Sequence, residues 1–259
     1  MKSYALITGA SSGIGLELAR VFAENKINLI IVARNGEKLQ ELKIELETKH
    51  SIEVNVFVYD LTDLEQCRKL CEDIERQNLI VEYLINNAGF GHYGLFHETN
   101  PDVDISMIRL NVESLTYLTH RIVKPMIQQK RGTIVNVAST AGFIPGPFMA
   151  TYFATKNYVV ALSLALAVEL KPHGIHVMVL CPGPTASNFA KAANIKGSDI
   201  FNPKIPTSRQ VAEFAFASIK KKKNLAIHGA KNRFTIWLSR FMPRTFLANM
   251  VGKAQKSSE

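Results

Sequence analysis

Tyr152 and Lys156 have the spacing at which a phenol and an ammonium group can act together. Two side chains four residues apart in a helix lie on the same face. A nearby positive charge favours the phenolate, and therefore lowers the pKa of tyrosine towards neutrality. This makes Tyr152 a candidate general acid. A helix of this length also carries such a pair by chance, so the pair predicts chemistry only if the rest of the chain supports it.

A glycine-rich turn near the start of the chain is a candidate phosphate-binding site. The apolar run of residues 4–8 leads into glycines at positions 9, 13 and 15, and a helix-like segment, residues 16–23, follows. Where a strand, a glycine turn and a helix follow one another, backbone N–H groups at the helix N-terminus can approach a pyrophosphate. Glycine permits both the tight turn and the close approach. The alternative is a turn that only connects two elements.

The end of the second apolar run predicts which dinucleotide binds. An acidic side chain at this point binds the 2′-hydroxyl of NAD, whereas a guanidinium suits the 2′-phosphate of NADP. Arg34 follows the run of residues 28–33, so we expect NADP(H). A solvated loop cation is the alternative for Arg34. Asp60, after the run of residues 54–59, is expected to reach the adenine edge.

Strand-like and helix-like segments alternate along the chain, which predicts an α/β fold. The pattern is typical of a Rossmann-type doubly wound parallel sheet flanked by helices on both faces, with ligands at the carboxyl ends of the strands. We expect a single domain over residues 1–259. The remaining expected strands are residues 83–86, 133–138, 176–181 and 225–228, and the helices are residues 38–49, 64–76, 102–129, one that begins at Tyr152, and 208–220.

The helix that begins at Tyr152 is apolar on nearly all sides over residues 159–168. Such a helix needs wide burial. Charged residues at both ends leave too short an apolar stretch for a membrane span. Burial against a second copy of the chain satisfies the requirement, so we expect a homodimer or homotetramer.

The net charge of +9 comes entirely from the end of the chain. Residues 1–217 carry 21 basic and 21 acidic side chains, whereas residues 218–259 carry 10 basic and one acidic. This asymmetry argues against a nucleic-acid surface spread over the body. Residues 230–259 are expected to form a basic amphipathic C-terminal extension. Three interpretations stay open for it: a helix packed on its own domain, a peripheral contact with an anionic membrane or cover for an apolar substrate, and a surface for a partner protein.

The three cysteines do not indicate a metal site. None lies at metal-ligand spacing from histidine or acidic partners. The first strand-like run begins close to Met1 and leaves no room for a signal peptide, so we expect a cytoplasmic protein, with membrane association through the tail as the open addition.

These motifs together resemble the short-chain dehydrogenase/reductase family over nearly the whole chain. The resemblance rests on matches in the family's order: Thr8-Gly9-x-x-x-Gly13-x-Gly15, Asn86-Asn87-Ala88-Gly89, Asn111, Ser139, Tyr152-x-x-x-Lys156 and Pro182-Gly183-Pro184-Thr185. The C-terminal region, Gly229 to Arg244, is similar to a bacterial DltE-like or ketoacyl reductase-like branch.

The resemblance implies a role for each matched residue. Tyr152 gives a proton to a carbonyl oxygen during reduction, and Ser139 hydrogen-bonds that oxygen. Lys156 lowers the pKa of Tyr152 and holds the nicotinamide ribose, while Asn111 supports a water-linked proton path. The cofactor-binding residues are expected to be Gly9, Ser11, Ser12, Gly13, Ile14, Gly15, Arg34, Asp60, Leu61, Asn87, Ala88, Gly89, Tyr152, Lys156, Pro182, Gly183 and Thr185.

The sequence therefore predicts an NADP(H)-dependent oxidoreductase that interconverts a carbonyl and an alcohol, with an acyl or other apolar compound as a candidate substrate. Hydride chemistry belongs to the cofactor, so the protein supplies positioning and a proton. The alternative is a regulatory protein that binds the dinucleotide without turnover, because a fold alone does not determine function.

Overall fold

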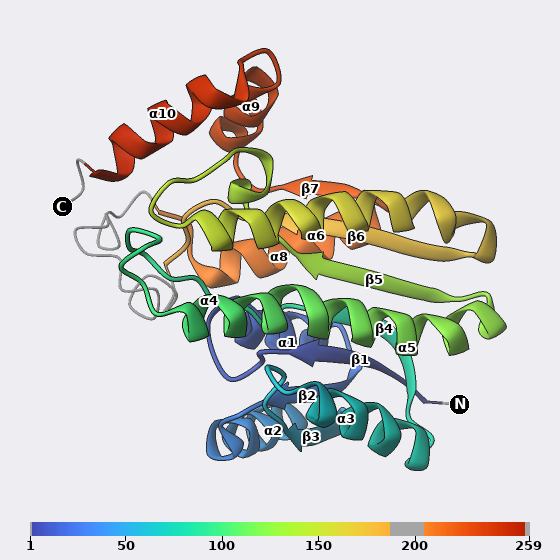
Figure 1. Ribbon diagram of the computed structural model, residues 1–259. Helices are drawn as coiled ribbons and strands as arrows, with labels where there is room; N and C mark the ends of the chain where they lie inside the picture. Colours follow the sequence, from blue (N-terminus) through green and yellow to red (C-terminus); the bar gives the residue numbers. More distant parts are fainter. Residues whose placement is uncertain (1, 187–204, 257–259) are drawn as a thin grey trace.

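The computed structural model describes residues 2–186 and 205–256, and helices cover both faces of one sheet (Figure 1). Over these residues the sheet has seven strands in the order β3-β2-β1-β4-β5-β6-β7. Every neighbouring pair is parallel. This confirms the expected doubly wound parallel sheet.

The strands are β1 Ser3–Thr8, β2 Asn28–Ala33, β3 Val54–Val58, β4 Ile80–Asn86, β5 Gly132–Val137, β6 Ile175–Cys181 and β7 Leu225–Ile227. The α-helices are α1 Gly13–Glu24, α2 Gly36–His50, α3 Leu64–Arg76, α4 Pro101–Ile108, α5 Leu115–Gln129, α6 Ala150–Glu169, α8 Ser208–Lys220, α9 Ala230–Ser239 and α10 Arg244–Lys256.

Alternate residues of each strand enter two separate apolar layers. In β1, Ala5 and Ile7 pack in the layer formed with α1, α2 and α8, whereas Tyr4 and Leu6 pack in the layer formed with α3, α5 and α6. Successive side chains of a strand point to opposite faces. Because both faces are covered, the strands are mostly apolar, as is usual in parallel sheets.

The order of the strands reverses beside β1, and this reversal positions the site. Strands β2 and β3 lie on one side of β1, and β4 to β7 lie on the other (Figure 1). Ligands of such sheets bind beyond the carboxyl ends of the strands near the reversal. The turns after β1, β4, β5 and β6 carry most of the predicted site residues, and they meet at this edge.

The segment expected as one helix over residues 102–129 is not a uniform α-helix. Helix α4 continues into a π-helical segment, Arg109–Ser114, and then into α5. The wider turn of a π-helix changes the direction of the side chains after it, and such turns occur often at functional sites. Asn111 lies within this segment and is only 1% exposed. An apolar periodicity in the sequence does not reveal a change of that kind.

Helix α6 has one buried face and one exposed, largely apolar face. Tyr152, Lys156 and Val159 are buried, whereas Leu164 and Val168 are 38% and 74% exposed. By length and composition alone α6 would be apolar enough to cross a membrane, but its inner face packs against the sheet. The exposed outer face agrees with the apolar pattern that led us to expect an oligomer, and the oligomer itself stays a prediction.

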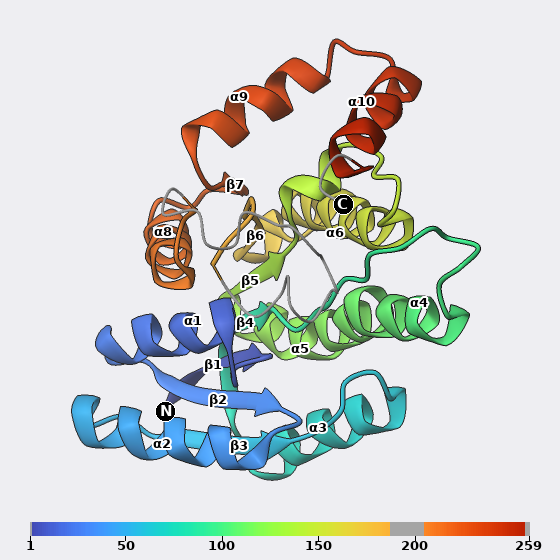
Figure 2. The same ribbon diagram turned by 90° about the vertical axis from the view of Figure 1, so that its left-hand side faces the viewer.

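The C-terminal segment folds into two helices, α9 and α10, beyond the β7 edge of the sheet (Figures 1 and 2). Pro243 immediately precedes α10 and separates it from α9. Ile236 of α9 and Leu247 of α10 are 5% and 3% exposed, and each is the only buried side chain of its helix. The rest of the pair leaves several large apolar side chains exposed.

Candidate active site

The glycine turn after β1 leaves no space for a side chain. Gly9 has a φ of +69°, a conformation that glycine adopts without strain. A Cβ atom at Gly15 would lie 2.3 Å from the carbonyl oxygen of Gly9 and 2.4 Å from Nδ2 of Asn87. Ser12, which precedes α1, makes no side-chain cap, whereas Asn35 and Asp63 cap α2 and α3. The close approach and the uncapped first turn of α1 fit the pyrophosphate of a dinucleotide.

Thr8 and Asn87 join the ends of β1 and β4. The backbone N–H groups of Asn87 and Ala88 donate to Oγ1 of Thr8 at 3.0 and 2.9 Å. The Asn87 side chain donates in return to the carbonyl oxygen of Thr8 at 2.9 Å. These bonds hold the Asn87-Ala88-Gly89 loop beside the glycine turn. Thr8 was part of the quoted motif, but sequence reasoning did not include it among the site residues.

The predicted adenosine-binding residues lie at the ends of β2 and β3. Arg34 directly follows β2, and its side chain is 74% exposed and 3.8 Å from Oδ2 of Asp60. Asp60 also accepts hydrogen bonds from the backbone N–H and hydroxyl of Thr62. An exposed ion pair of this length is weak. The Arg34 guanidinium is therefore free to reorient towards a phosphate. Leu61 is 4% exposed, and its carbonyl oxygen accepts from the hydroxyl of Ser114.

Ser139, Tyr152 and Lys156 come together where β5 ends and α6 begins. Ser139 precedes a short 3₁₀ turn, and its Oγ accepts from the N–H of Ala141 at 3.1 Å. Tyr152 is 8% exposed and shares a hydrogen bond with Ser139. The Nζ atom of Lys156 donates to the carbonyl oxygen of Val137 at 2.9 Å and lies 5.8 Å from the centre of the Tyr152 ring. The spacing of Tyr152 and Lys156 does place both on the inner face of α6.

The pKa of Tyr152 moves in the direction opposite to the one expected from the sequence. Burial raises it to about 12, and the hydrogen bond with Ser139 offsets only part of that effect. Burial likewise lowers the pKa of Lys156 to about 8. Both shifts follow from desolvation of the charged form, which outweighs any attraction between the two groups in this structure.

Asn111 ties the loop after β4 to α6. Its Nδ2 donates to the carbonyl oxygen of Phe90 at 3.0 Å and to Oγ1 of Thr155 at 3.1 Å, and its Oδ1 accepts from the Phe90 N–H at 3.2 Å. A Cβ atom at Gly89 would lie 2.8 Å from Oδ1 of Asn111 and 3.4 Å from Nζ of Lys156. Gly89 thus occupies the narrow space between these two side chains. Thr155 is a contact that sequence reasoning missed, and the water-linked path through Asn111 stays a prediction.

The loop after β6 contacts both Ser139 and the C-terminal helices. The carbonyl oxygen of Pro182 accepts from the N–H of Thr140 at 2.8 Å and from Oγ of Ser139 at 3.4 Å. A Cβ atom at Gly183 would lie 2.4 Å from Nδ2 of Asn232 in α9. Thr185 donates to the carbonyl oxygen of Gly183 at 2.9 Å. Asn232 is therefore a further site residue that the sequence did not identify.

Helix α10 packs beside the candidate catalytic tyrosine. Val251 joins the apolar cluster that contains Tyr152. The Tyr93 and Phe148 rings stack with centres 5.7 Å apart, and the Tyr93 hydroxyl donates to the carbonyl oxygen of Gln255 at 3.2 Å. The substrate side thus contains aromatic groups and part of the tail. Residues 185–206 follow the carboxyl end of a strand, so the sequence predicts that they cover this side, but most of that segment lies outside the described residues.

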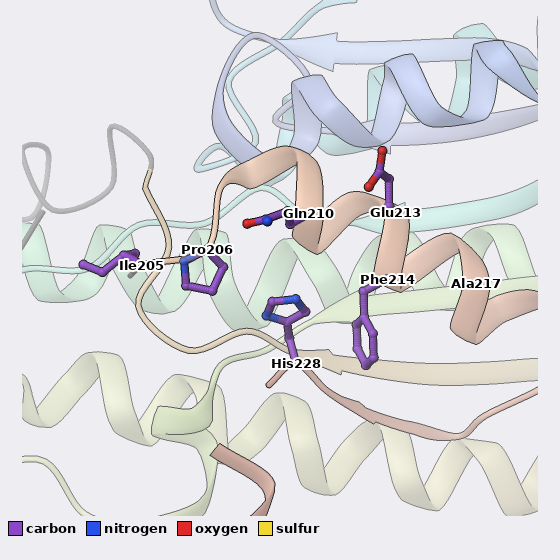
Figure 3. Close-up of a pocket in the computed structure, with 7 residues that line it drawn as sticks. All are labelled: Ile205, Pro206, Gln210, Glu213, Phe214, Ala217 and His228. Atoms are coloured by element: carbon purple, nitrogen blue, oxygen red, sulfur yellow. The ribbon is translucent and has the colours of Figure 1, made fainter. Parts of the chain in front are cut away.

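A surface hollow of about 570 Å³ lies away from these residues, between α8 and the end of β7 (Figure 3). Phe214 and His228 both line it and pack edge to face, with ring centres 5.1 Å apart. Burial lowers the pKa of His228. None of the predicted catalytic or cofactor-binding residues lines this hollow. The hollow is therefore not part of the candidate active site.

Known proteins share both the sequence and the fold. The family description "short chain dehydrogenase" matches residues 3–197. Dehydrogenase/reductase SDR family member 7B of Bos taurus is 31% identical over 97% of this chain and 81% of its own length. The very-long-chain 3-oxoacyl-CoA reductase of Pyrenophora tritici-repentis is 36% identical over 68% of this chain and 52% of its own length.

A solved structure agrees with these relatives. The short-chain dehydrogenase from Sphingobium yanoikuyae in complex with NADPH is 31% identical, with a TM-score of 0.83 over 92% of this chain and 93% of that chain. Because the family match covers well over half of the chain and the fold agrees, this protein belongs to the short-chain dehydrogenase/reductase family.

Proposed function

We propose that this protein is an NADPH-dependent reductase that converts a ketone or aldehyde of an acyl or other apolar compound into an alcohol. The observation that carries the proposal is the meeting of two hydroxyl groups, those of Ser139 and Tyr152, above the buried amine of Lys156. Two hydroxyl donors aimed at one carbonyl oxygen stabilise the negative charge that grows there during reduction.

The raised pKa of Tyr152 favours the direction of reduction. With a pKa of about 12 the phenol keeps its proton at neutral pH, and the protonated phenol is the form that can give a proton to the carbonyl oxygen. Ser139 donates a second hydrogen bond to the same oxygen. Lys156, with a pKa of about 8, exchanges protons near neutral pH, which suits a group that returns a proton towards Tyr152. The bound cofactor supplies the hydride.

NADP(H) is proposed as the cofactor because of Arg34. Its exposed guanidinium follows β2, where the adenosine ribose of a dinucleotide lies in folds of this kind. Planar guanidinium groups bind phosphate through paired hydrogen bonds. The related Sphingobium yanoikuyae enzyme, described in complex with NADPH, supports the same choice.

An apolar substrate is proposed from the side chains around Tyr152. Phe153 and Met149 are buried beside it, and Phe90, Tyr93 and Val251 pack against the same cluster. The relative named as a very-long-chain 3-oxoacyl-CoA reductase supports an acyl compound. Assignment to a DltE-like or ketoacyl reductase-like branch rests on the C-terminal motif alone and stays part of this proposal.

The proposal is tested by NADPH oxidation over a panel of carbonyl compounds that includes 3-oxoacyl thioesters, bulky ketones and short aldehydes. We expect turnover that increases with the apolar size of the substrate and that is faster with NADPH than with NADH. Tight NADPH binding without turnover on any compound would instead support a non-catalytic, dinucleotide-binding regulatory protein.

We also propose that the protein works in the cytoplasm as a homodimer or homotetramer formed through the outer face of α6. Support comes from the exposed Tyr158, Leu164 and Val168, which form an uncharged strip on that helix. Light scattering of the purified protein and of Leu164→Asp provides the test. A wild-type protein that remains monomeric at high concentration would refute the oligomer.

A further inference from the structure

The C-terminal helices expose aromatic side chains on one side. Phe234, Trp237 and Phe241 are 62%, 53% and 70% exposed. Neighbouring ring centres lie 6.0 and 5.1 Å apart, so the three form one continuous group, here called the aromatic cluster. Phe246 and Met250 of α10 are also exposed, at 53% and 45%. Contiguous exposed apolar groups of this size mark interaction surfaces in soluble proteins.

The orientation of the aromatic cluster is set by the packing of α9. Ile236 is 5% exposed and packs in the apolar layer with Ala138 and Val159, so the opposite side of α9 must face outward. Phe234 and Trp237 lie three residues apart, which places them along that outward side, and the Phe241 ring, just after the end of α9, packs against Trp237. Figures 1 and 2 show α9 and α10 at the outside of the molecule, beyond β7. The aromatic cluster is thus presented on helices that project beyond the edge of the sheet.

Cations without acidic partners accompany the aromatic cluster. Among the described residues from position 230 onward there is no Asp or Glu, and the cations make no ion pair with another described residue. Several arginines of the body are paired, since Arg20, Arg121 and Arg209 each lie within 2.9 Å of a glutamate. The unpaired cations are Lys231, Arg233, Arg240, Arg244, Lys253 and Lys256.

We propose that α9 and α10 form a docking surface for an anionic lipid bilayer. Aromatic rings bind favourably at the boundary between headgroups and acyl chains, and lysine and arginine are attracted to anionic headgroups. The combination of exposed rings and unpaired cations on projecting helices matches both requirements. A folded protein partner would need a complementary acidic hollow, whereas a bilayer accommodates projecting side chains by local displacement of lipids.

The docking surface is in direct contact with the substrate side of the site. Val251 of α10 packs in the cluster that contains Tyr152, and a Cβ atom at Gly252 would lie 3.2 Å from the Pro147 ring. The same short helix therefore lies against the site on its inner side and exposes Phe246 outward. An apolar substrate could pass from the bilayer along α10, a consequence that rests on the proposed function, although the docking itself does not.

Trp237 gives the docking surface a built-in reporter, because it is the only tryptophan of the chain. The full-length protein is mixed with vesicles of phosphatidylcholine alone, or of phosphatidylcholine with phosphatidylglycerol, and the tryptophan emission is recorded. We expect a shift to shorter wavelength, and quenching by lipids brominated in the acyl chain, only with the anionic vesicles. An emission spectrum unchanged by anionic vesicles would overturn the proposal.

Vesicle sedimentation with matched variants tests which side chains are responsible. The tail variant combines Arg233→Gln, Arg240→Gln and Arg244→Gln. It should bind anionic vesicles at least roughly tenfold more weakly than the wild type, because each cation near an anionic surface contributes to binding. A control variant, here called the body variant, removes three positive charges from the rest of the protein, at side chains that are 62%, 48% and 76% exposed. It consists of Lys49→Gln, Arg68→Gln and Arg76→Gln, and should bind within roughly twofold of the wild type.

A second pair of variants separates the aromatic contribution. Phe234→Ser with Phe241→Ser keeps the Trp237 reporter and should lose roughly tenfold in binding. Its control, Ile44→Ser with Val58→Ser, alters side chains 65% and 51% exposed near the opposite edge of the sheet, and should bind like the wild type. Thermal unfolding checks that each variant is folded.

Three outcomes would refute bilayer docking. Equal losses in the tail and body charge variants would show that net charge alone attracts the protein. Binding to a nucleic acid with higher affinity than to anionic vesicles would assign the surface to that partner. Self-association that disappears in Phe234→Ser with Phe241→Ser, without any vesicle binding by the wild type, would assign it to a second copy of the chain.

Discussion

The two halves of the candidate site are built in different ways. In the cofactor half, the backbone at Gly9 and Gly15 lies so close to the Asn87 side chain and to neighbouring backbone atoms that no space is left for a Cβ atom. In the substrate half, Tyr152 belongs to an apolar cluster against which Val251, from far along the chain, packs. The first half depends on backbone geometry, and the second depends on burial and packing. We therefore expect that even a small added side chain will disrupt the cofactor half. The substrate half should respond mainly to the loss of a functional group.

The largest expected effect is on turnover and comes from the substrate half. Replacement of Tyr152 by Phe removes the proton donor while the ring stays buried, so kcat should fall by roughly 10²- to 10⁴-fold. NADPH affinity should change little, as measured by fluorescence titration. Tyr158→Phe is the matched control, because Tyr158 lies on the outer face of α6 and shares a hydrogen bond with Thr116. Comparable kcat values for Tyr152→Phe and the wild type would remove Tyr152 from the proposed role.

The next effect is on stability and its pH dependence. The pKa of Lys156 is about 8 in the folded protein against an ordinary value of 10.5, so between these values the unfolded state binds more protons. The free energy of unfolding should therefore rise with pH across this window, by about 3 kcal/mol for this group.

The raised pKa of Tyr152 limits this rise in the free energy of unfolding. Its pKa is raised from 10.0 to about 12, so the folded state holds more protons in that range and stability should fall above about pH 10. Lys156→Met removes the first contribution only. Urea unfolding at several pH values measures both contributions to the free energy of unfolding. If this free energy rises between pH 8 and 10.5 as much in Lys156→Met as in the wild type, Lys156 is not the source of the rise.

A pair of glycine substitutions compares the two halves directly. Gly15→Ala places a methyl group 2.3 Å from a backbone oxygen, and should cost about 1–3 kcal/mol of stability and abolish tight NADPH binding. Gly252→Ala in α10 meets only the edge of the Pro147 ring at 3.2 Å, and alanine is the better helix former, so stability should change by less than about 1 kcal/mol. Thermal unfolding and NADPH titration distinguish the two. Similar losses at both positions would contradict the comparison.

The smallest expected effect concerns cofactor choice in the cofactor half. Arg34→Ala should weaken NADPH binding by roughly tenfold, because it removes a charge-assisted contact with the 2′-phosphate, and should leave NADH binding almost unchanged. Arg68→Ala removes an exposed cation from α3 and serves as the control. Equal weakening of NADPH and NADH by Arg34→Ala would mean that the 2′-phosphate binds elsewhere.

Local patterns were enough to predict the fold class and most of the residues that meet at the carboxyl edge of the sheet. The alternation of segments predicted the parallel sheet, and the spacing of Tyr152 and Lys156 predicted their shared helix face. The glycine turn was recognisable because the backbone conformation it needs is available to few other residues. Each of these features depends on residues close together in the chain.

Contacts between distant segments could not be predicted in the same way. Asn232 approaches Gly183, although the C-terminal motif that contains Asn232 gives no sign of this contact, and Val251, which belongs to no recognised motif, packs in the cluster of Tyr152. The π-helical turn around Asn111 also left no trace in the apolar pattern. Such contacts depend on how helices pack after the sheet has formed, and many sequences satisfy the same packing.

The sequence by itself thus determined the sheet and the types of residue in the site. Only the tertiary structure decided the protonation of its central pair, because desolvation depends on everything that covers a group rather than on its neighbour four residues away. Burial raises the pKa of Tyr152 and keeps the phenol protonated, whereas a neighbouring lysine was expected to lower that pKa. Burial also brings the pKa of Lys156 to about 8.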